Sequence, residues 1–236
     1  MTHVDIINAT TTLTNEAVAA IIPPLQIQVS RDLATAWGII ASVFFVPRGA
    51  SPTKGHWWLV LLDNSDVAGA LGYHDITTEG LPIGKVFVTT TQQAGLSWTV
   101  TTSHELAEML VDPDVNLAAQ VSDTRFYAYE VGDPVEADAL GYLINGVLLS
   151  DFVTPAWFEA LVHPVGTLFD HAGHLTGPLQ LAAGGYISVL DVRSSGWMQL
   201  TAHASYRQRP KVGSRRERRT LPRAQWLRST AYVGLV

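Results

Sequence analysis

The sequence contains no cysteine, and charged residues make up only 15% of its 236 positions. Without cysteine the fold cannot depend on disulfides, a metal site cannot use thiolate ligands, and a cysteine nucleophile is excluded, so the chain is not a thiol protease. Hydrophobic residues make up 47% of the chain, which is the balance of a packed globular protein. Its length suits one large domain or two small ones.

Long apolar runs are also missing. The longest, at residues 38–46, is far shorter than the roughly 20 residues that span a bilayer. The first five residues lack the basic and apolar segments of a secretory signal. We therefore expect a soluble protein of the cytoplasm or of a virion, with no membrane partner.

Basic residues are scarce until the end of the chain. Residues 1–206 contain 6 Lys or Arg and 20 acids, a net charge of 6 − 20 = −14, whereas residues 207–236 contain 9 and 1, a net charge of 9 − 1 = +8. The sequence therefore predicts an acidic body, 1–206, and a basic arm, 207–236. We expect residues 207–228 to dock on an acidic protein surface or to contact nucleic acid.

The N-terminal part of the body has both helical and strand patterns. Thr14 is a predicted N-cap for a helix over 17–22, which Pro23-Pro24 interrupts or follows with a new helix that ends near Trp37. Segments rich in β-branched and aromatic residues predict strands, and a helix that ends before Pro113 follows them. The strands are expected at 38–46, 57–62 and 85–90, and the helix at 99–111.

The second part of the body, after residue 113, consists of short extended pieces. Asn145-Gly146 between apolar runs predicts a type I′ hairpin over 140–149, and a second hairpin is expected from 184–192 and 197–202. A weak strand at 125–131 and a short helix from Thr154 to about residue 162 complete this part. We expect an α+β fold, with helices and a mixed sheet in 1–113 and hairpins in 114–206.

The sequence His104-Glu105-Leu106-Ala107-Glu108 lies in the last predicted helix and has the spacing of a metal site. Residues four apart in a helix lie on one face, so His104 and Glu108 can bind the same ion. An imidazole and a carboxylate suit Zn²⁺. Glu105 can then take a proton from a water molecule that the ion holds. The alternative is an amphipathic helix with surface acids.

Three further features favour the metal site. Apolar residues flank the motif, so that the helix can bury its other face. The strand over 84–90 could lie along a cleft and pair with an extended peptide. Acids that offer a third ligand follow the helix at Asp112, Asp114, Glu130, Asp133 and Glu136.

Three sequence strings give the chain a resemblance to a known superfamily. They are SHELAEMLVDP at 103–113, YEVGDPVE at 129–136 and SDFVTPAWF at 150–158. With the order of helices and strands before them, they resemble the zincin metallopeptidases and, within these, a set of poorly characterised bacterial and phage proteins. The resemblance covers most of residues 5–192. It implies that His104 and Glu108 bind metal and that Glu105 is the general base.

The third ligand is not settled by the resemblance, because zincins differ in where it lies and the H-x-x-G-x-x-H continuation of the metzincins is absent. We favour Asp133, since Glu130-Val131-Gly132-Asp133 places two carboxylates on a tight turn that can fold back over the helix. Asp112 is the competitor, because it lies eight residues beyond His104. Its position before Pro113 could equally make it a hydrogen-bonding residue at the helix end.

Other histidines do not form a recognisable site in the sequence. His74, His163, His171, His174 and His203 lack a spaced partner that would complete a catalytic triad. The segment 170–174, Asp-His-Ala-Gly-His, is either a second ion site or a polar loop. We expect the loop, because Gly173 breaks any helix that would align the two rings.

These observations leave three functional hypotheses. The first is a zinc-dependent, zincin-like metallopeptidase that acts on a peptide or protein, with Glu105 as base and His104, Glu108 and Asp133 or Asp112 as ligands. The second is an interaction protein, such as a structural component of a phage virion, that keeps the scaffold without turnover. The third is a nucleic-acid-associated protein that acts through its basic arm.

Overall fold

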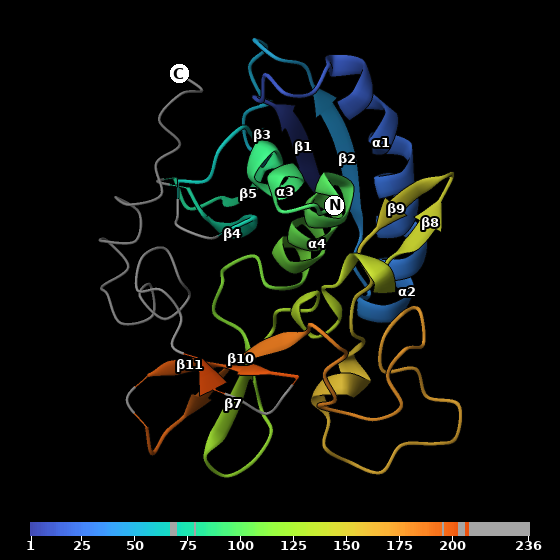
Figure 1. The fold of residues 1–236 in the computed structure, drawn as a ribbon, viewed down its shortest axis with the longest axis vertical. Coiled ribbons are helices and arrows are strands. Elements are labelled where there is room, and N and C mark those ends of the chain that lie inside the picture. The colour runs from blue at the N-terminus through green and yellow to red at the C-terminus, as the bar shows by residue number, and fades with distance from the viewer. Residues whose placement is uncertain (67–69, 78, 195, 203–205, 208–236) are drawn as a thin grey trace.

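The structure is a computed structural model that describes residues 1–66, 70–77, 79–194 and 196–202, together with the backbone of 206–207. Helix accounts for 27% of the chain and strand for 28%. The α-helices and one of two five-stranded sheets occupy the N-terminal part, and short strands follow (Figure 1). The predicted α+β class is therefore confirmed.

A five-stranded mixed sheet organises the N-terminal part, with strand order β2-β1-β3-β5-β4. All neighbouring strands run parallel except β4, which pairs antiparallel with β5. The strands are β1 (Thr2–Asn8), β2 (Ala41–Val46), β3 (Trp57–Leu62), β4 (Gly72–Ile76) and β5 (Pro82–Phe87). Strand β4 therefore lies at one end of the sheet among the described residues.

Helix α1 (Asn15–Ile27) begins where the sequence predicts, because the Thr14 hydroxyl accepts a hydrogen bond from the Ala17 N–H at 3.2 Å. The expected interruption at Pro23-Pro24 is wrong, since both prolines lie inside the helix. A π-helical turn, η1 (Gln28–Leu33), and α2 (Ala34–Trp37) continue the helical path. The path ends at Gly38, whose φ of 68° is left-handed and favours glycine.

The expected strand at 85–90 is only partly correct. Strand β5 begins earlier and ends at Phe87, and α3 (Val88–Gln93) takes up the remaining residues. Strand β5 also lies between β3 and β4, so its two sides are already paired and it cannot pair with a peptide as expected. The first and fourth strands, β1 and β4, were not expected.

Helix α4 (Trp98–Val111) confirms the predicted helix and packs against β5 and β4. Its buried Leu106 joins one core cluster with Val18 of α1 and with Ile6 and Leu59 of the sheet. The neighbouring strand residue Ile7 belongs to a separate cluster, because alternate residues of a strand point to opposite faces. Helices α1 and α4 therefore pack on the same face of the sheet.

The C-terminal part is built from antiparallel strands; β7, β10 and β11 lie below the first sheet in Figure 1, and the β8–β9 hairpin lies beside α1. Asn145 (φ 51°) and Gly146 (φ 80°) form the turn between β8 and β9, and β10 pairs with β11, so both predicted hairpins are confirmed. The predicted helix after Thr154 is only one turn, η4 (Pro155–Phe158). The strands are β6 (Ala118–Gln120), β7 (Arg125–Ala128), β8 (Tyr142–Ile144), β9 (Val147–Leu149), β10 (Tyr186–Asp191), β11 (Trp197–Thr201) and β12 (Tyr206–Arg207).

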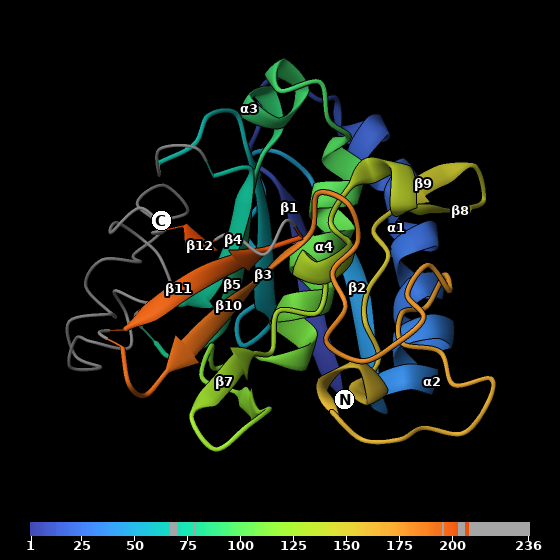
Figure 2. The ribbon, with the colours of Figure 1, turned by 60° about the horizontal axis from the view of Figure 1, so that its bottom comes forward.

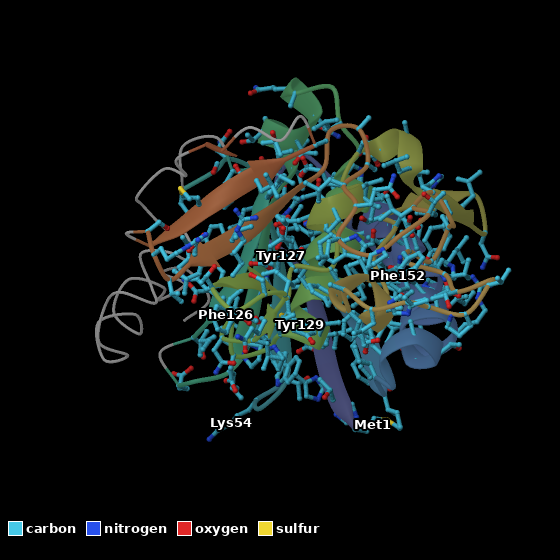
Figure 3. All side chains as sticks on the ribbon, turned by 90° about the horizontal axis from the view of Figure 1, so that it is seen from below. Met1, Lys54, Phe126, Tyr127, Tyr129 and Phe152 are labelled. Atoms are coloured by element: carbon cyan, nitrogen blue, oxygen red, sulfur yellow. The ribbon has the colours of Figure 1, made fainter. Side chains whose placement is uncertain are left out.

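Aromatic side chains form the core of this part. Tyr129 stacks on Phe158 with ring centroids 4.4 Å apart, and Trp157 is fully buried. Seen from below in Figure 3, Tyr129 lies near the middle of the molecule, whereas Met1 and Lys54 lie at its edge. Two further one-turn helices, η2 (Asp133–Val135) and η3 (Asp138–Leu140), lead from β7 to the β8–β9 hairpin.

One expectation concerns a part of the chain that the structure does not describe. Apart from the backbone of Arg207, the basic segment 207–228 lies outside the described residues. None of the helices in the described ranges combines the length and the apolar character that crossing a lipid bilayer requires.

Leu106→Ala tests the packing of α4 on the sheet. Leu106 is 0% exposed, so its truncation leaves a cavity and we expect the free energy of unfolding to fall by about 2–5 kcal/mol. Denaturant titration followed by circular dichroism measures the loss. Leu143→Ala, at a leucine that is 67% exposed, is the matched control and should cost less than about 0.5 kcal/mol. Equal losses in the two variants would contradict this packing.

Candidate metal centre

Helix α4 carries three of the predicted site residues, and two of them converge. His104 Nε2 lies 3.3 Å from Glu108 Oε1, as expected for side chains one helical turn apart. The third member of this group, Asp133, comes from η2 and places its Oδ1 3.5 Å from His104 Nε2. One ligand atom of each of these three residues lies within 4.8 Å of the others. The structure thus brings His104, Glu108 and Asp133 together.

The chain that follows β7 reaches α4 through a close contact at Gly132. Figure 2 shows this chain passing across α4, and the Gly132 N–H donates to Glu108 Oε1 at 3.2 Å. A Cβ at position 132 would lie 2.5 Å from His104 Nδ1, closer than such atoms approach in proteins. A residue with a side chain therefore does not fit here unless the His104 ring moves.

Asp112, the alternative third ligand, lies outside this group. One of its oxygens accepts hydrogen bonds from the N–H groups of Asn116 and Leu117, at 2.9 and 3.1 Å. The carboxylate therefore stabilises the turn after α4. This is the second of the two roles that the sequence left open for Asp112.

His74 is a member of the site that the sequence analysis missed. Its Nδ1 lies 3.6 Å from Glu108 Oε2 and 3.8 Å from Glu105 Oε2. Alternation along β4 turns Gly72 to the same side, where a Cβ would lie 2.6 Å from Glu105 Oε1. Nothing in the local sequence marks His74, because only the antiparallel pairing of β4 with β5 places it beside α4.

Glu130 completes the cluster, with its Oε2 3.9 Å from His74 Nε2. In the described part of the chain the cluster has four carboxylates and two imidazoles, and each residue is at most 9% exposed. If all four carboxylates were ionised and both imidazoles neutral, the cluster would have a net charge of −4. Burying that charge is costly unless protons or a cation offset it.

The pKa values of the α4 residues reflect this crowding. Burial, and then repulsion from Glu130 and Asp133, raise the pKa of Glu108 to about 8. Burial also raises the pKa of Glu105 well above its ordinary value. Burial alone would lower the pKa of His104, but the neighbouring carboxylates, Glu108 first, raise it well above its ordinary value. In the absence of a cation, burial and crowding therefore favour the protonated forms of these groups.

The donor set fits a zinc ion. Zinc binds imidazole nitrogen and carboxylate oxygen, which are the groups that His104, Glu108 and Asp133 offer. Glu105 Oε2 is buried and has no hydrogen-bond partner among the described residues. A buried oxygen of this kind is costly unless a proton, a cation or a bound molecule compensates it. His74, Glu105 and Glu108 form a second group whose ligand atoms meet the same distance limit.

The raised pKa values predict how the stability of the metal-free protein depends on pH. Glu105, Glu108 and His104 bind protons more tightly in the folded than in the unfolded chain. Stability should therefore fall as the pH rises from about 4.5, the ordinary value for glutamate, to about 8, the value for Glu108. Asp151, whose pKa burial raises to about 8, adds to this fall, whereas His171, whose pKa burial lowers, opposes it.

Thermal unfolding in chelator, at several pH values in this interval, measures the effect. Glu108→Gln should make the fall shallower, because it removes one of the groups that take up a proton on folding. Glu79→Gln, at an exposed glutamate, is the control and should leave the slope unchanged. A melting temperature that rises over the interval would show that the cluster does not hold protons.

Gly132→Ala tests the contact between the loop and His104. Because the new Cβ displaces the His104 ring, we expect zinc affinity to fall by roughly 10–100-fold, the size seen when ligand orientation is lost. Gly177→Ala is the matched control, since nothing lies within 4 Å of a Cβ at that position. Calorimetric titration with zinc compares the two. Unchanged affinity in Gly132→Ala would mean that His104 is not held by this loop.

Comparison with known proteins gives no further guidance on this centre. No family model matches the chain, and neither the curated proteins nor the solved structures contain a significant match. The function therefore has to be argued from the geometry of the cluster.

Proposed function

We propose that the protein is a zinc-dependent hydrolase of the zincin-like metallopeptidase type, which cleaves peptide bonds by means of an activated water molecule. The observation that carries the proposal is the convergence of His104, Glu108 and Asp133 beside Glu105. These residues come from a helix and from a loop that are separated by two strands of the C-terminal sheet.

The three ligand residues would hold zinc through one nitrogen and two carboxylate oxygens. Catalytic zinc sites in proteins have three protein ligands and one open position. Zinc in such a site acts as a Lewis acid and lowers the pKa of a water molecule toward about 7. Gly132 fixes Glu108 through its N–H group and makes room for the His104 ring.

Glu105 is suited to take and return a proton. It lies next to the proposed ligand His104 in the helix, and burial raises its pKa well above its ordinary value, which makes the carboxylate a stronger base. His74 Nδ1, 3.8 Å from Glu105 Oε2, stands where it can orient this carboxylate. Gly72 leaves the space that the Glu105 side chain occupies.

The three strings that carry the resemblance to zincins are in contact with one another, which supports treating them as one unit. The Ser150 N–H of the third string donates to the Ser103 hydroxyl of the first at 2.7 Å. The Val153 N–H of the third string donates to the Val131 carbonyl of the second at 2.8 Å. The third string is thus hydrogen-bonded both to the helix and to the loop that supply the candidate ligands.

A second candidate function is a protein that keeps this centre without turnover, such as a structural component of a phage virion. The burial of the cluster favours it, because His104 is only 9% exposed and Glu105 only 5%. Under this second candidate, the metal would stabilise the fold and would not meet a substrate. With either function we propose a location in the cytoplasm or in a virion.

Glu105→Gln tests the first candidate. The change keeps the size of the side chain and removes its capacity to take a proton, so we expect hydrolysis of a peptide library to fall by roughly 10²–10⁴-fold. The zinc content of Glu105→Gln should still exceed that of His104→Ala by the same amount as in the unaltered protein, because His104 is retained. Chelator should abolish the activity of the unaltered protein. Glu16→Gln, at an exposed glutamate in the first turn of α1, is the matched control.

Two results would contradict the proposed peptidase activity. One is hydrolysis that persists in Glu105→Gln at the level of Glu16→Gln. The other is zinc that depends on His104 in a protein that cleaves no peptide of the library, which would favour the structural role.

A further inference from the structure

A second cluster of ligand-type side chains lies apart from α4, in the C-terminal part. Asp151, Asp170 and His174 each place one ligand atom within 4.8 Å of the others. Two chain segments carry them, and these segments pair at a bridge between Val153 and Asp170. The His171 N–H strengthens the pairing by donating to the Phe152 carbonyl at 2.9 Å.

Asp151 is fully buried, and only one of its two carboxylate oxygens accepts hydrogen bonds from backbone N–H groups. Its Oδ1 accepts hydrogen bonds from the N–H groups of Phe152 and Ala172, at 2.8 and 3.0 Å. Its Oδ2 is buried and has no hydrogen-bond partner within the described residues. Such an oxygen costs free energy unless a proton or a cation meets it.

Asp170 is also fully buried and is held in a fixed orientation. Its Oδ2 accepts from the His174 N–H and its Oδ1 from the Leu175 N–H, both at 2.7 Å. Burial, then a hydrogen bond that the protonated Asp151 can donate to Asp170, and then repulsion from the Asp170 carboxylate raise the pKa of Asp151 to about 8. Ionising two adjacent buried carboxylates together is costly unless a proton or a cation offsets the repulsion.

His174 is exposed and can bring such a charge. Its Nε2 lies 3.0 Å from the Leu140 carbonyl oxygen. In the tautomer that donates this hydrogen bond, Nδ1 carries the lone pair that a metal requires. His171 does not join the group, because its ring stacks on Phe152 and its Nε2 points toward Asp32, 3.6 Å away.

We propose that Asp151, Asp170 and His174 form a second, structural zinc site, independent of the centre on α4. One imidazole and two carboxylates are a donor set that zinc accepts. The ion would join the segments on either side of residues 154–169 and so hold this loop, which contains η4, to the body. His174 is the exposed member of the group, whereas Asp151 and Asp170 are fully buried.

His174→Ala is the primary test, with His163→Ala as the matched control. His163 is an exposed histidine of the same region, and its Nε2 contacts the Glu159 carbonyl oxygen at 2.8 Å. Zinc content of the full chain after dialysis, and calorimetric titration, should show the loss of one equivalent in His174→Ala and none in His163→Ala. In His104→Ala the equivalent that depends on His174 should remain, because the two sites share no residue.

Asp151→Asn provides a second test that preserves the fold. Asparagine keeps Oδ1 as an acceptor for the Phe152 and Ala172 N–H groups and replaces the oxygen that would bind zinc. We expect Asp151→Asn to lose the same one equivalent of bound zinc as His174→Ala. Zinc should raise the melting temperature of His104→Ala, and this rise should disappear when Asp151→Asn is added to His104→Ala.

If circular dichroism shows that His174→Ala is unfolded, the zinc content of Asp151→Asn tests the second site instead. Zinc content equal to that of the unaltered protein in the folded variants would overturn the second site, and would mean that Asp151 and Asp170 share a proton. That result would leave the centre on α4 untouched, since the zinc that depends on His104 is measured separately.

Discussion

Repulsion among buried carboxylates is the constraint on which the proposed chemistry depends. Glu105, Glu108, Glu130 and Asp133 meet in the interior, where water cannot screen them. His74 and His104 lie among them and can offset only part of the charge. A fold that keeps such a cluster gives up stability for it, and the cation that we propose would offset the charge through donor atoms that suit it.

The surrounding structure is arranged to allow this crowding. Gly72 and Gly132 lack the Cβ that would otherwise press on Glu105 and His104. Strand β4 and the loop after β7 can therefore approach α4 closely because positions 72 and 132 have no side chain. The Ser103 hydroxyl, which accepts from the Ser150 N–H, ties the same helix to the segment that leads to the second cluster.

The two clusters differ in a way that matches the roles proposed for them. The cluster on α4 has a carboxylate, Glu105, next to a ligand, and a histidine beside that carboxylate. The cluster at Asp151 and Asp170 has no such group assigned to it, and backbone N–H groups hold both of its carboxylates in place. This difference supports the proposals that the first cluster moves a proton and that the second holds an ion.

The sequence by itself determined the local geometry. The Thr14 cap, the Asn145-Gly146 turn and the spacing of His104 and Glu108 each depend on a few neighbouring residues, and the structure has them as predicted. Only the tertiary structure decided what distant segments bring to α4. It placed His74 beside the helix through the pairing of β4, and it turned Asp133 toward His104. Sheet order and loop closure join residues far apart in the chain, and no local pattern encodes which of several acids arrives.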